Sequence, residues 1–206
     1  MTIITFVIPS IGRMTLNRTI QSLQNLNNPN WKAIIIFDGV KSNINDISDN
    51  RIRYFEIEKR GYNNRAGLTR NYGINKVEDS KWIGFVDDDD TLSPDYIDKL
   101  LIETKYNTDV IMFRMKSDSG IIPPLETNSI TRGCVGISFC VKTPILKLMM
   151  FETNSFIEDY TLLKRLNKKY SILLSKYITY FIRSNPTKVS YGVESIISPM
   201  FLKYRV

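Results

Sequence analysis

The sequence contains no histidine and only two cysteines among its 206 residues. The absence of histidine excludes a histidine-based catalytic triad and a metal site built from cysteine and histidine. Both cysteines, Cys134 and Cys140, fall in one expected strand region, so they indicate no disulfide framework. We therefore expect a reducing, cytoplasmic compartment.

Long hydrophobic runs are also absent. No stretch of about 18 apolar residues occurs, so we expect no membrane span. The first residues, "MTIITFVIPS", have no basic segment before them and include a proline, and we interpret them as a strand rather than a secretion signal.

The net charge of +7 indicates an anionic partner, but the sequence has no dense basic run interleaved with aromatic residues. Lysine and arginine are scattered along the chain instead. A phosphorylated small substrate would account for the charge equally well, and we do not expect nucleic-acid binding.

Hydrophobic residues make up 43% of the chain and charged residues 24%, as is typical of a globular protein. Apolar runs alternate with amphipathic segments, which predicts a single α/β domain over residues 1–206, with a mostly parallel central sheet and helices on both faces.

Thr15 and Ser93 are the expected N-caps of two helices. Residues 117–133 are polar and turn-rich, and we expect a surface excursion there. The expected strands are 2–8, 33–37, 53–57, 82–86, 109–115, 134–142 and 178–183, and the expected helices are 15–26, 65–77, 94–106 and 156–170.

Polar residues follow three of the expected strands at the point where each strand ends. They are "PSIGR" at residues 9–13, Asp38 with Gly39, and the four aspartates Asp87–Asp90. Ligands of open parallel sheets bind beyond the carboxyl ends of the strands. We therefore expect the three segments to line one crevice.

The run Asp87–Asp90 directly follows a buried strand, and its carboxylates need a compensating positive species. Mg²⁺ or Mn²⁺ is suitable, since these ions take carboxylate and phosphate oxygens. If the segment is extended, Asp87 and Asp89 point to the same side and Asp88 to the other. The alternative is a solvated acidic turn ahead of a helix, which would account for Asp95 and Asp90.

Arg70 falls in the middle of an apolar face of the helix expected at 65–77. The other members of this face are Ala66, Gly73, Ile74 and Val77. An arginine in such a place is costly unless it is paired. A diphosphate is a suitable partner, and an internal aspartate is equally suitable.

Asp159 lies at the centre of the apolar stripe of the helix expected at 156–170, and Glu158 lies about 100° to one side. The stripe consists of Leu162, Leu163, Leu166 and Tyr170. A carboxylate at the leading end of an inward-facing stripe could take a proton from an acceptor hydroxyl. The alternative is an acidic pair that stabilises the helix dipole.

The segments "FVIPSIGR", "IIIFDG", "NNRAGLTRNYGI", "WIGFVDDDDTLSPDYI", "FIEDYTLLKRL" and "YFIRSNPTKVS" together resemble the successive motifs of nucleotide-sugar glycosyltransferases with the GT-A fold. The similarity is greatest to the inverting group called glycosyltransferase family 2, and it covers nearly the whole chain. It implies a Rossmann-like fold in which residues 1–116 bind the nucleotide sugar and residues 117–206 face the acceptor.

The resemblance implies a role for each of the matching residues. Asp89 and Asp87 match the DxD motif, which holds Mn²⁺ or Mg²⁺ against the diphosphate. Asp159, with Glu158 beside it, matches the motif that supplies the catalytic base. The implied donor-binding residues are Pro9, Ser10, Ile11, Arg13, Asp38, Arg65, Arg70, Asp87 and Asp88, with Asp38 accepting from the base and Asp88 contacting the ribose or sugar.

Two features depart from the family pattern. Many relatives complete the metal site with a histidine near the chain end, which this sequence lacks, so the metal would depend on Asp89, Asp87, the donor phosphates and water. Residues 117–133, where acceptor contacts are expected, follow no recognisable motif.

The function implied is metal-dependent transfer of a sugar, with inversion, from a UDP-sugar to a hydroxyl of a glycan or glycoprotein. The resemblance also suggests a source, a large DNA virus that glycosylates its own capsid, which would place the protein in the host cytoplasm.

Two other functions compete with this one. "FVDDDDT" also fits a haloacid-dehalogenase-like phosphohydrolase with Asp87 as nucleophile and Asp89 as acid/base, although that motif normally opens the first strand of its fold. The other is a non-catalytic sugar-nucleotide-binding module.

Overall fold

The computed structural model describes residues 1–42, 44, 48–60, 66–152, 155 and 157–182, and the strands in these residues form one nine-stranded sheet. The strands are β1 (Thr2–Ser10), β2 (Trp31–Asp38), β3 (Ile52–Ile57), β4 (Ser80–Phe85), β5 (Thr91–Leu92), β6 (Val110–Ser117), β7 (Gly120–Ile122), β8 (Phe139–Lys142) and β9 (Ile172–Phe181). The helices are α1 (Leu16–Gln24), α2 (Gly67–Asn75), α3 (Tyr96–Glu103), α4 (Thr143–Met149) and α5 (Glu158–Leu166), with a 3₁₀ turn η1 (Thr104–Tyr106). The sheet order is β3-β2-β1-β4-β8-β6-β9-β5, and β7 pairs with β6.

The first four strands are parallel, as their nearly continuous apolar sequences predict. The chain runs outward from β1 to β2 and β3 and then returns to place β4 on the other side of β1. The strand order therefore reverses between β1 and β4. The carboxyl ends of two adjacent strands at such a reversal are the usual ligand-binding place in an open α/β sheet.

The other half of the sheet is mixed. β8 is antiparallel to both β4 and β6, β5 is antiparallel to β9, and β9 is parallel to β6. A strand parallel to its predecessor needs a long crossover connection, usually a helix. The connection from β6 to β8, residues 118–138, contains no helix, and the two strands are antiparallel. The α/β class is confirmed, whereas the parallel order is confined to β1–β4 and to the pair β6–β9.

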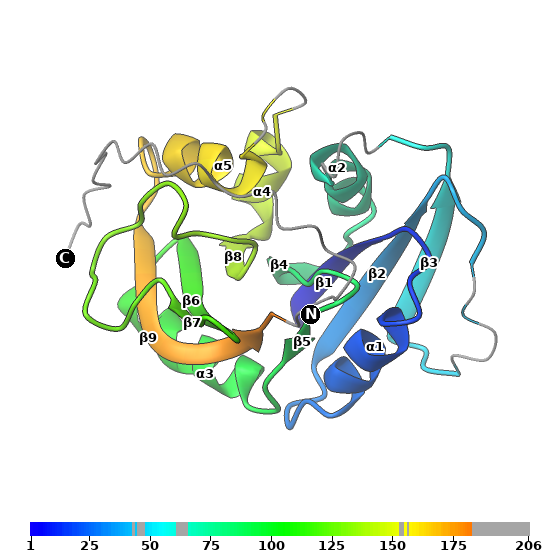
Figure 1. The fold of residues 1–206 in the computed structure, drawn as a ribbon, viewed down its shortest axis with the longest axis horizontal. Helices are drawn as coiled ribbons and strands as arrows, with labels where there is room; N and C mark the ends of the chain where they lie inside the picture. Colours follow the sequence, from blue (N-terminus) through cyan, green and yellow to red (C-terminus); the bar gives the residue numbers. More distant parts are fainter. Residues whose placement is uncertain (43, 45–47, 61–65, 153–154, 156, 183–206) are drawn as a thin grey trace.

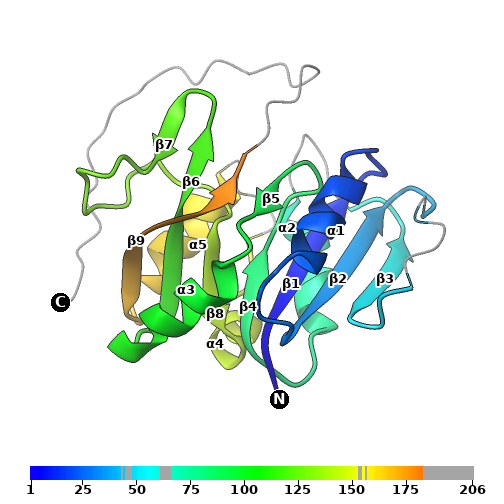
Figure 2. The same cartoon turned by 90° about the horizontal axis from the view of Figure 1, so that it is seen from below.

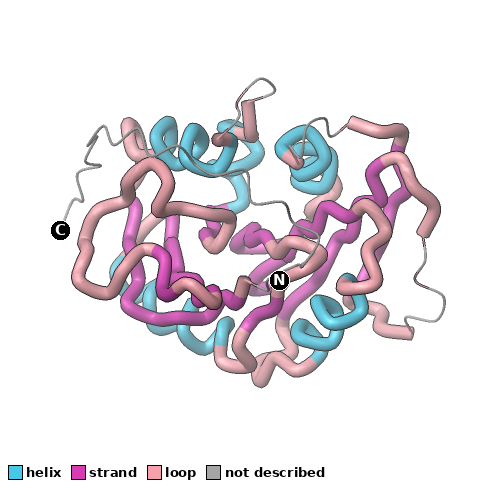
Figure 3. Tube along the Cα trace, in the orientation of Figure 1, coloured by secondary structure: helices cyan, strands magenta, loops and turns pink. Residues whose placement is uncertain are grey.

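Helices cover both faces of the sheet, as expected. In Figure 1, α2, α4 and α5 lie above the sheet and α1 and α3 lie below it. Figure 2, seen from below, brings α1 and α3 to the front, and Figure 3 shows the same two layers of helix around the strands. Within the described residues, no helix combines the length and apolarity needed to cross a bilayer.

Several element boundaries differ from the expected ones. The strand expected at 134–142 is only β8, the last strand begins at Ile172 rather than 178, and α4 and β7 were not expected. Thr15 occupies the N-cap of α1 without a side-chain hydrogen bond. The prediction of Ser93 as an N-cap is wrong: Asp95 holds that position before α3, and the Ser93 hydroxyl donates to Asp95 Oδ1 at 2.7 Å.

Gly73 lets α2 lie directly on β1 and β2. A Cβ at this position would lie 2.5 Å from Val7 Cγ1 and 2.6 Å from Ile36 Cδ1. We expect Gly73→Ala to lower the free energy of unfolding by about 1–3 kcal/mol, because the added methyl group overpacks the core. Urea unfolding measures this change. Asn75→Ala, at an exposed position of the same helix, is the control and should change stability by less than about 0.5 kcal/mol. Equal stability of both variants would contradict the close packing.

Candidate active site

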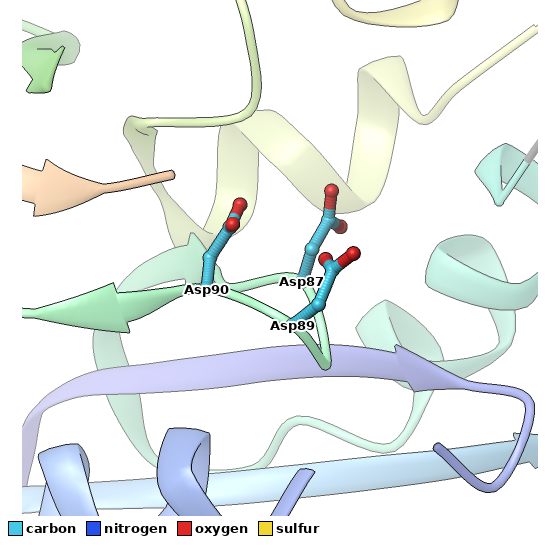
Figure 4. Close-up of side chains that lie close together, drawn as sticks. All are labelled: Asp87, Asp89 and Asp90. Carbon is cyan, nitrogen blue, oxygen red and sulfur yellow. The ribbon is translucent and has the colours of Figure 1, made fainter. Parts of the chain in front are cut away.

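The aspartate run forms a turn at the carboxyl end of β4. The backbone N–H of Asp90 donates to the carbonyl of Asp87 at 3.1 Å. The interpretation of this run as an extended segment is therefore wrong. The turn brings Asp87, Asp89 and Asp90 to one side, as Figure 4 shows, with one carboxylate oxygen of each within 4.8 Å of the others. Asp90 joins the cluster because a turn, unlike a strand, does not alternate its side chains.

Asp88 points the other way, toward the end of β1. Its carboxylate accepts hydrogen bonds from Ser10 Oγ at 2.8 Å and the backbone N–H of Ile11 at 3.3 Å, and it pairs with Arg13 Nη1 at 2.6 Å. Burial raises the pKa of Asp88, although Ser10 and Arg13 act to lower it. Asp88 therefore joins the two strand ends on either side of the reversal in strand order.

The cluster of Asp87, Asp89 and Asp90 has the donor set of a hard divalent cation. All three offer carboxylate oxygens, which Mg²⁺ and Mn²⁺ prefer, and no histidine or thiolate is needed. Asp89 is 2% exposed, and Arg13 Nη1 lies 3.7 Å from its Oδ2. The residues therefore fit the expected metal, with Asp90 as a third carboxylate that the sequence interpretation did not include.

Tyr180, from β9, forms hydrogen bonds with two residues of the aspartate turn. Its hydroxyl donates to Asp90 Oδ2 at 2.9 Å and accepts from the backbone N–H of Asp87 at 3.1 Å. The side chain is fully buried. Burial and the nearby Asp90 raise the pKa of Tyr180 well above its usual value, so the hydroxyl keeps the proton that it donates. Sequence reasoning missed this residue, since a tyrosine in a strand gives no local signal.

Arg70 links the acidic turn to α5. It is 4% exposed, its Nη2 lies 2.6 Å from Asp87 Oδ1, and its Nη1 pairs with Glu158 and lies 3.7 Å from Asp159 Oδ1. Burial alone would lower the pKa of Arg70, but the three carboxylates outweigh it and raise the pKa. The internal aspartate that the sequence allowed as a partner of Arg70 is Asp87.

Glu158 and Asp159 have different surroundings at the start of α5. The Glu158 carboxylate accepts from the backbone N–H groups of Ala66 at 3.2 Å and Gly67 at 2.8 Å, and it pairs with Arg70. Asp159 Oδ1 is buried and accepts no hydrogen bond from the described residues. Asp159 lies on the face of α5 whose leucines are fully buried, as the sequence predicted.

The pKa of Asp159 is raised to about 7. Burial is the main cause, and the charges of Glu158 and Asp87 add to it, whereas Arg70 lowers the pKa. Because this pKa is higher in the folded than in the unfolded chain, the contribution of Asp159 to stability is complete below its unfolded pKa and is lost as the pH rises through about 7. A carboxylate with this pKa can accept a proton near neutral pH.

The other predicted residues that the structure describes lie at or just beyond the carboxyl ends of β1 and β2. Pro9 lies in β1 opposite Ile36 of β2, and Ile11 is 55% exposed just beyond the strand. The carboxylate of Asp38 accepts from the backbone N–H of Arg60 at 2.6 Å and from Thr69 Oγ1 at 2.8 Å. Arg65 lies outside the described residues.

The chain matches a known protein family over most of its length. The profile described as Glycosyl transferase family 2 matches residues 5–180. Among curated proteins, EpsH of Bacillus subtilis (strain 168), provisionally named a glycosyltransferase, is 31% identical over 99 residues, which are 45% of this chain and 27% of EpsH.

Solved structures of S. aureus TarS resemble the chain in fold. TarS 1-349 superposes with a TM-score of 0.70 at 14% identity, covering 88% of this chain and 60% of TarS 1-349. Its complex with UDP-GlcNAc gives a TM-score of 0.69 at 14% identity, with 89% and 59% covered. These values, with the family match, confirm the GT-A-like α/β fold. The chain spans about 27% of EpsH and about 60% of these TarS chains.

Proposed function

The chain belongs to glycosyl transferase family 2, and from this premise we propose that it transfers a sugar from a nucleotide-sugar donor to an acceptor hydroxyl. The observation that supports this most strongly is the arrangement at one sheet edge: the carboxylates of Asp87, Asp89 and Asp90 cluster there, and Arg70 joins Asp87 to the partly buried Asp159. TarS has been solved with UDP and with UDP-GlcNAc, and a UDP-sugar is accordingly the proposed donor.

In this proposal Asp159 is the catalytic base. It takes the proton of the acceptor hydroxyl, whose oxygen attacks the anomeric carbon while the bond from that carbon to the diphosphate oxygen breaks. Attack from the side opposite the leaving group inverts the configuration. A pKa of about 7 suits this step, because a base is most effective when its pKa is close to the working pH.

Asp87, Asp89 and Asp90 are the proposed ligands of Mn²⁺ or Mg²⁺. When bound, the ion would supply positive charge that stabilises the departing diphosphate. Tyr180 would hold Asp90 in place, and Arg70 would hold Asp87, so that the carboxylates need little rearrangement. Three carboxylates would also make up for the histidine that this chain lacks.

Residues 1–116 are the proposed donor side and residues 117–206 the acceptor side of a single domain. Ser10, Arg13 and Asp88 form a hydrogen-bonded group next to the acidic turn, where a ribose or sugar hydroxyl would find both donors and acceptors. The other proposed donor contacts are Pro9, Ile11, Asp38 and Arg65.

A glycan or glycoprotein is the proposed acceptor, and the cytoplasm is the proposed location. The location is supported by Cys134 and Cys140, both of which are free thiols, as a reducing compartment would keep them.

A product assay tests the proposed function. Purified protein is incubated with UDP-sugars, Mn²⁺ and a panel of glycan acceptors, and the nucleotide products are separated by chromatography. We expect UDP as the nucleotide product, in an amount proportional to the amount of acceptor supplied. Free inorganic phosphate as the primary product would favour the phosphohydrolase instead, and donor binding without turnover on any acceptor would favour the binding module.

Asp89→Asn tests the metal ligands in the same assay. We expect the variant to need about 100-fold more Mn²⁺ for half-maximal rate, because it loses a charged ligand. Glu78→Gln is the control: Glu78 is exposed, pairs with Arg53 and lies before β4 at the opposite edge of the sheet. A Mn²⁺ requirement of Asp89→Asn equal to that of Glu78→Gln would contradict the assignment.

A further inference from the structure

We propose that Glu158 is a positioning residue that clamps α2 to α5, and that it does not itself act on the substrate. Its carboxylate accepts hydrogen bonds from the backbone N–H groups at the start of α2 and pairs with Arg70. Arg70 also contacts Asp87 and Asp159. The catalytic consequence rests on the proposed function, whereas the clamp itself does not. This separates the roles of the two acidic residues that the sequence interpretation grouped as catalytic.

The start of α2 lacks a cap of its own. Its N-cap is Ala66, which has no polar side chain, and its first turn contains no acidic residue. The first N–H groups of a helix have no partner within the helix and point outward with a partial positive charge. Glu158 supplies the missing acceptor from another helix: Oε1 accepts from Ala66 N and Oε2 from Gly67 N.

Gly67 provides the space in which the Glu158 carboxylate lies. A Cβ at this position would lie 2.8 Å from Glu158 Oε2 and 3.2 Å from Phe151 Cβ. Any larger residue would therefore push the carboxylate away from the N–H groups. The glycine and the glutamate come from distant parts of the sequence and fit each other only in the fold.

The same carboxylate also binds Arg70, one turn further along α2. Glu158 thus accepts from three donors, two backbone N–H groups and one guanidinium, and both of its carboxylate oxygens are bound by the protein. Asp159 differs: its Oδ1 accepts no hydrogen bond from the described residues, and the side chain is 26% exposed, so an acceptor hydroxyl can reach the carboxylate. The arrangement fits Asp159 as the base and Glu158 as its support.

A second contact joins the same two parts of the chain. The side chain of Asn71 donates to the carbonyl of Phe151 and accepts from the backbone N–H of Phe151, both at 2.9 Å. The ring of Phe151 lies 5.6 Å from the guanidinium carbon of Arg70. α2 is therefore held to the chain segment before α5 as well as to α5, and the clamp determines where Arg70, Asp87 and Asp159 lie relative to one another.

Two variants disturb the clamp in different ways. Glu158→Gln keeps the length of the side chain and removes its charge, whereas Gly67→Ala keeps Glu158 and displaces it. We expect each to lower kcat about 10–100-fold, because misplacement of a catalytic group has effects of that size, with the KM for the UDP-sugar changed less than about threefold. The kcat of the double variant should be no lower than that of the less active single variant, because both substitutions break the same interaction. Glu78→Gln is the exposed control.

The pH dependence of kcat is a readout that a purely structural role would not change. Asp159 is faced by Arg70, Glu158 and Asp87. Removing the negative charge of Glu158 in Glu158→Gln should move the midpoint of the rise in kcat to lower pH, since that charge raises the pKa of Asp159. An unchanged midpoint, with kcat as in the control, would overturn the proposal.

Amide hydrogen exchange tests the clamp without any turnover. In Glu158→Gln and in Gly67→Ala, the N–H groups at positions 66 and 67 should exchange faster than in the unmodified protein, and those at the end of α2 should not. Unchanged exchange in both variants would overturn the clamp. So would a loss of kcat in Glu158→Gln as large as in Asp159→Asn together with full activity of Gly67→Ala, since Glu158 would then be the base. Faster exchange in a protein that transfers no sugar would support the clamp and reject only the proposed function.

Discussion

Replacing Asp159 with asparagine is expected to lower kcat by about 10²–10⁴, the range typical of the loss of a general base. The amide has nearly the same shape but cannot accept the proton of the acceptor hydroxyl. The KM for the donor should change little, because Asp159 belongs to the acceptor side of the proposed site. Steady-state kinetics with a saturating acceptor measures both quantities.

The same assignment of the base predicts how kcat of the unmodified protein depends on pH. kcat should fall as the pH drops below a midpoint at or below about 7, because protonated Asp159 cannot act as a base and a bound divalent ion would lower its pKa from the value of about 7. In the Asp159→Asn variant, kcat should not show this fall at low pH.

Stability separates a chemical loss from unfolding. Above pH 7, Asp159→Asn should not be less stable than the unmodified protein, since the charged form of Asp159 is the one that burial disfavours. Asp79→Asn is a matched control at an exposed position of positive φ, which asparagine tolerates. Full activity of Asp159→Asn would contradict the assignment of the base.

Arg70→Met is expected to lower the free energy of unfolding by about 3–5 kcal/mol at pH 8, the cost typical of removing one partner from a buried ion pair. The reason is that Asp87, Glu158 and Asp159 lose the guanidinium that they share. Chemical denaturation at pH 8 measures the change.

The loss in Arg70→Met should shrink as the pH falls toward 7, and below 7 the contribution of Asp159 to it should stay constant. Arg70 lowers the pKa of Asp159, so in its absence Asp159 becomes protonated at a higher pH and no longer needs a cation. Arg53→Met is the control, since Arg53 is exposed and its surface pair with Glu78 is worth about 0–1 kcal/mol. Equal losses in the two variants would contradict a central role for Arg70.

Hydrophobic periodicity predicted the strands that position the site. β1, β2 and β4 consist mostly of apolar residues, and their polar ends lie at one edge because parallel strands point the same way. The burial of Arg70 and the inward-facing leucines of α5 followed from helical spacing in the same manner. These features depend on local pattern, which one sequence contains.

The features that were missed depend on tertiary contacts. The inclusion of Asp90 depends on a turn within the run Asp87–Asp90, where an extended segment was expected. The contacts of Tyr180 with Asp90 and Asp87 come from a strand about 90 residues away in sequence, and the contact of Glu158 with Gly67 also joins distant segments. Periodicity within one element gives no information about which side chains meet across two elements. The antiparallel insertion of β8 was missed for the same reason.

Isothermal titration of Mn²⁺ into the protein, with and without UDP, tests most directly whether the aspartate cluster holds a divalent ion shared with a nucleotide diphosphate. With the association of Mn²⁺ and UDP in solution subtracted, we predict that UDP tightens Mn²⁺ binding by about 5–150-fold and that Mn²⁺ tightens UDP binding by the same factor. In Asp89→Asn this coupling should disappear. Equal Mn²⁺ affinity with and without UDP in the unmodified protein would contradict the account.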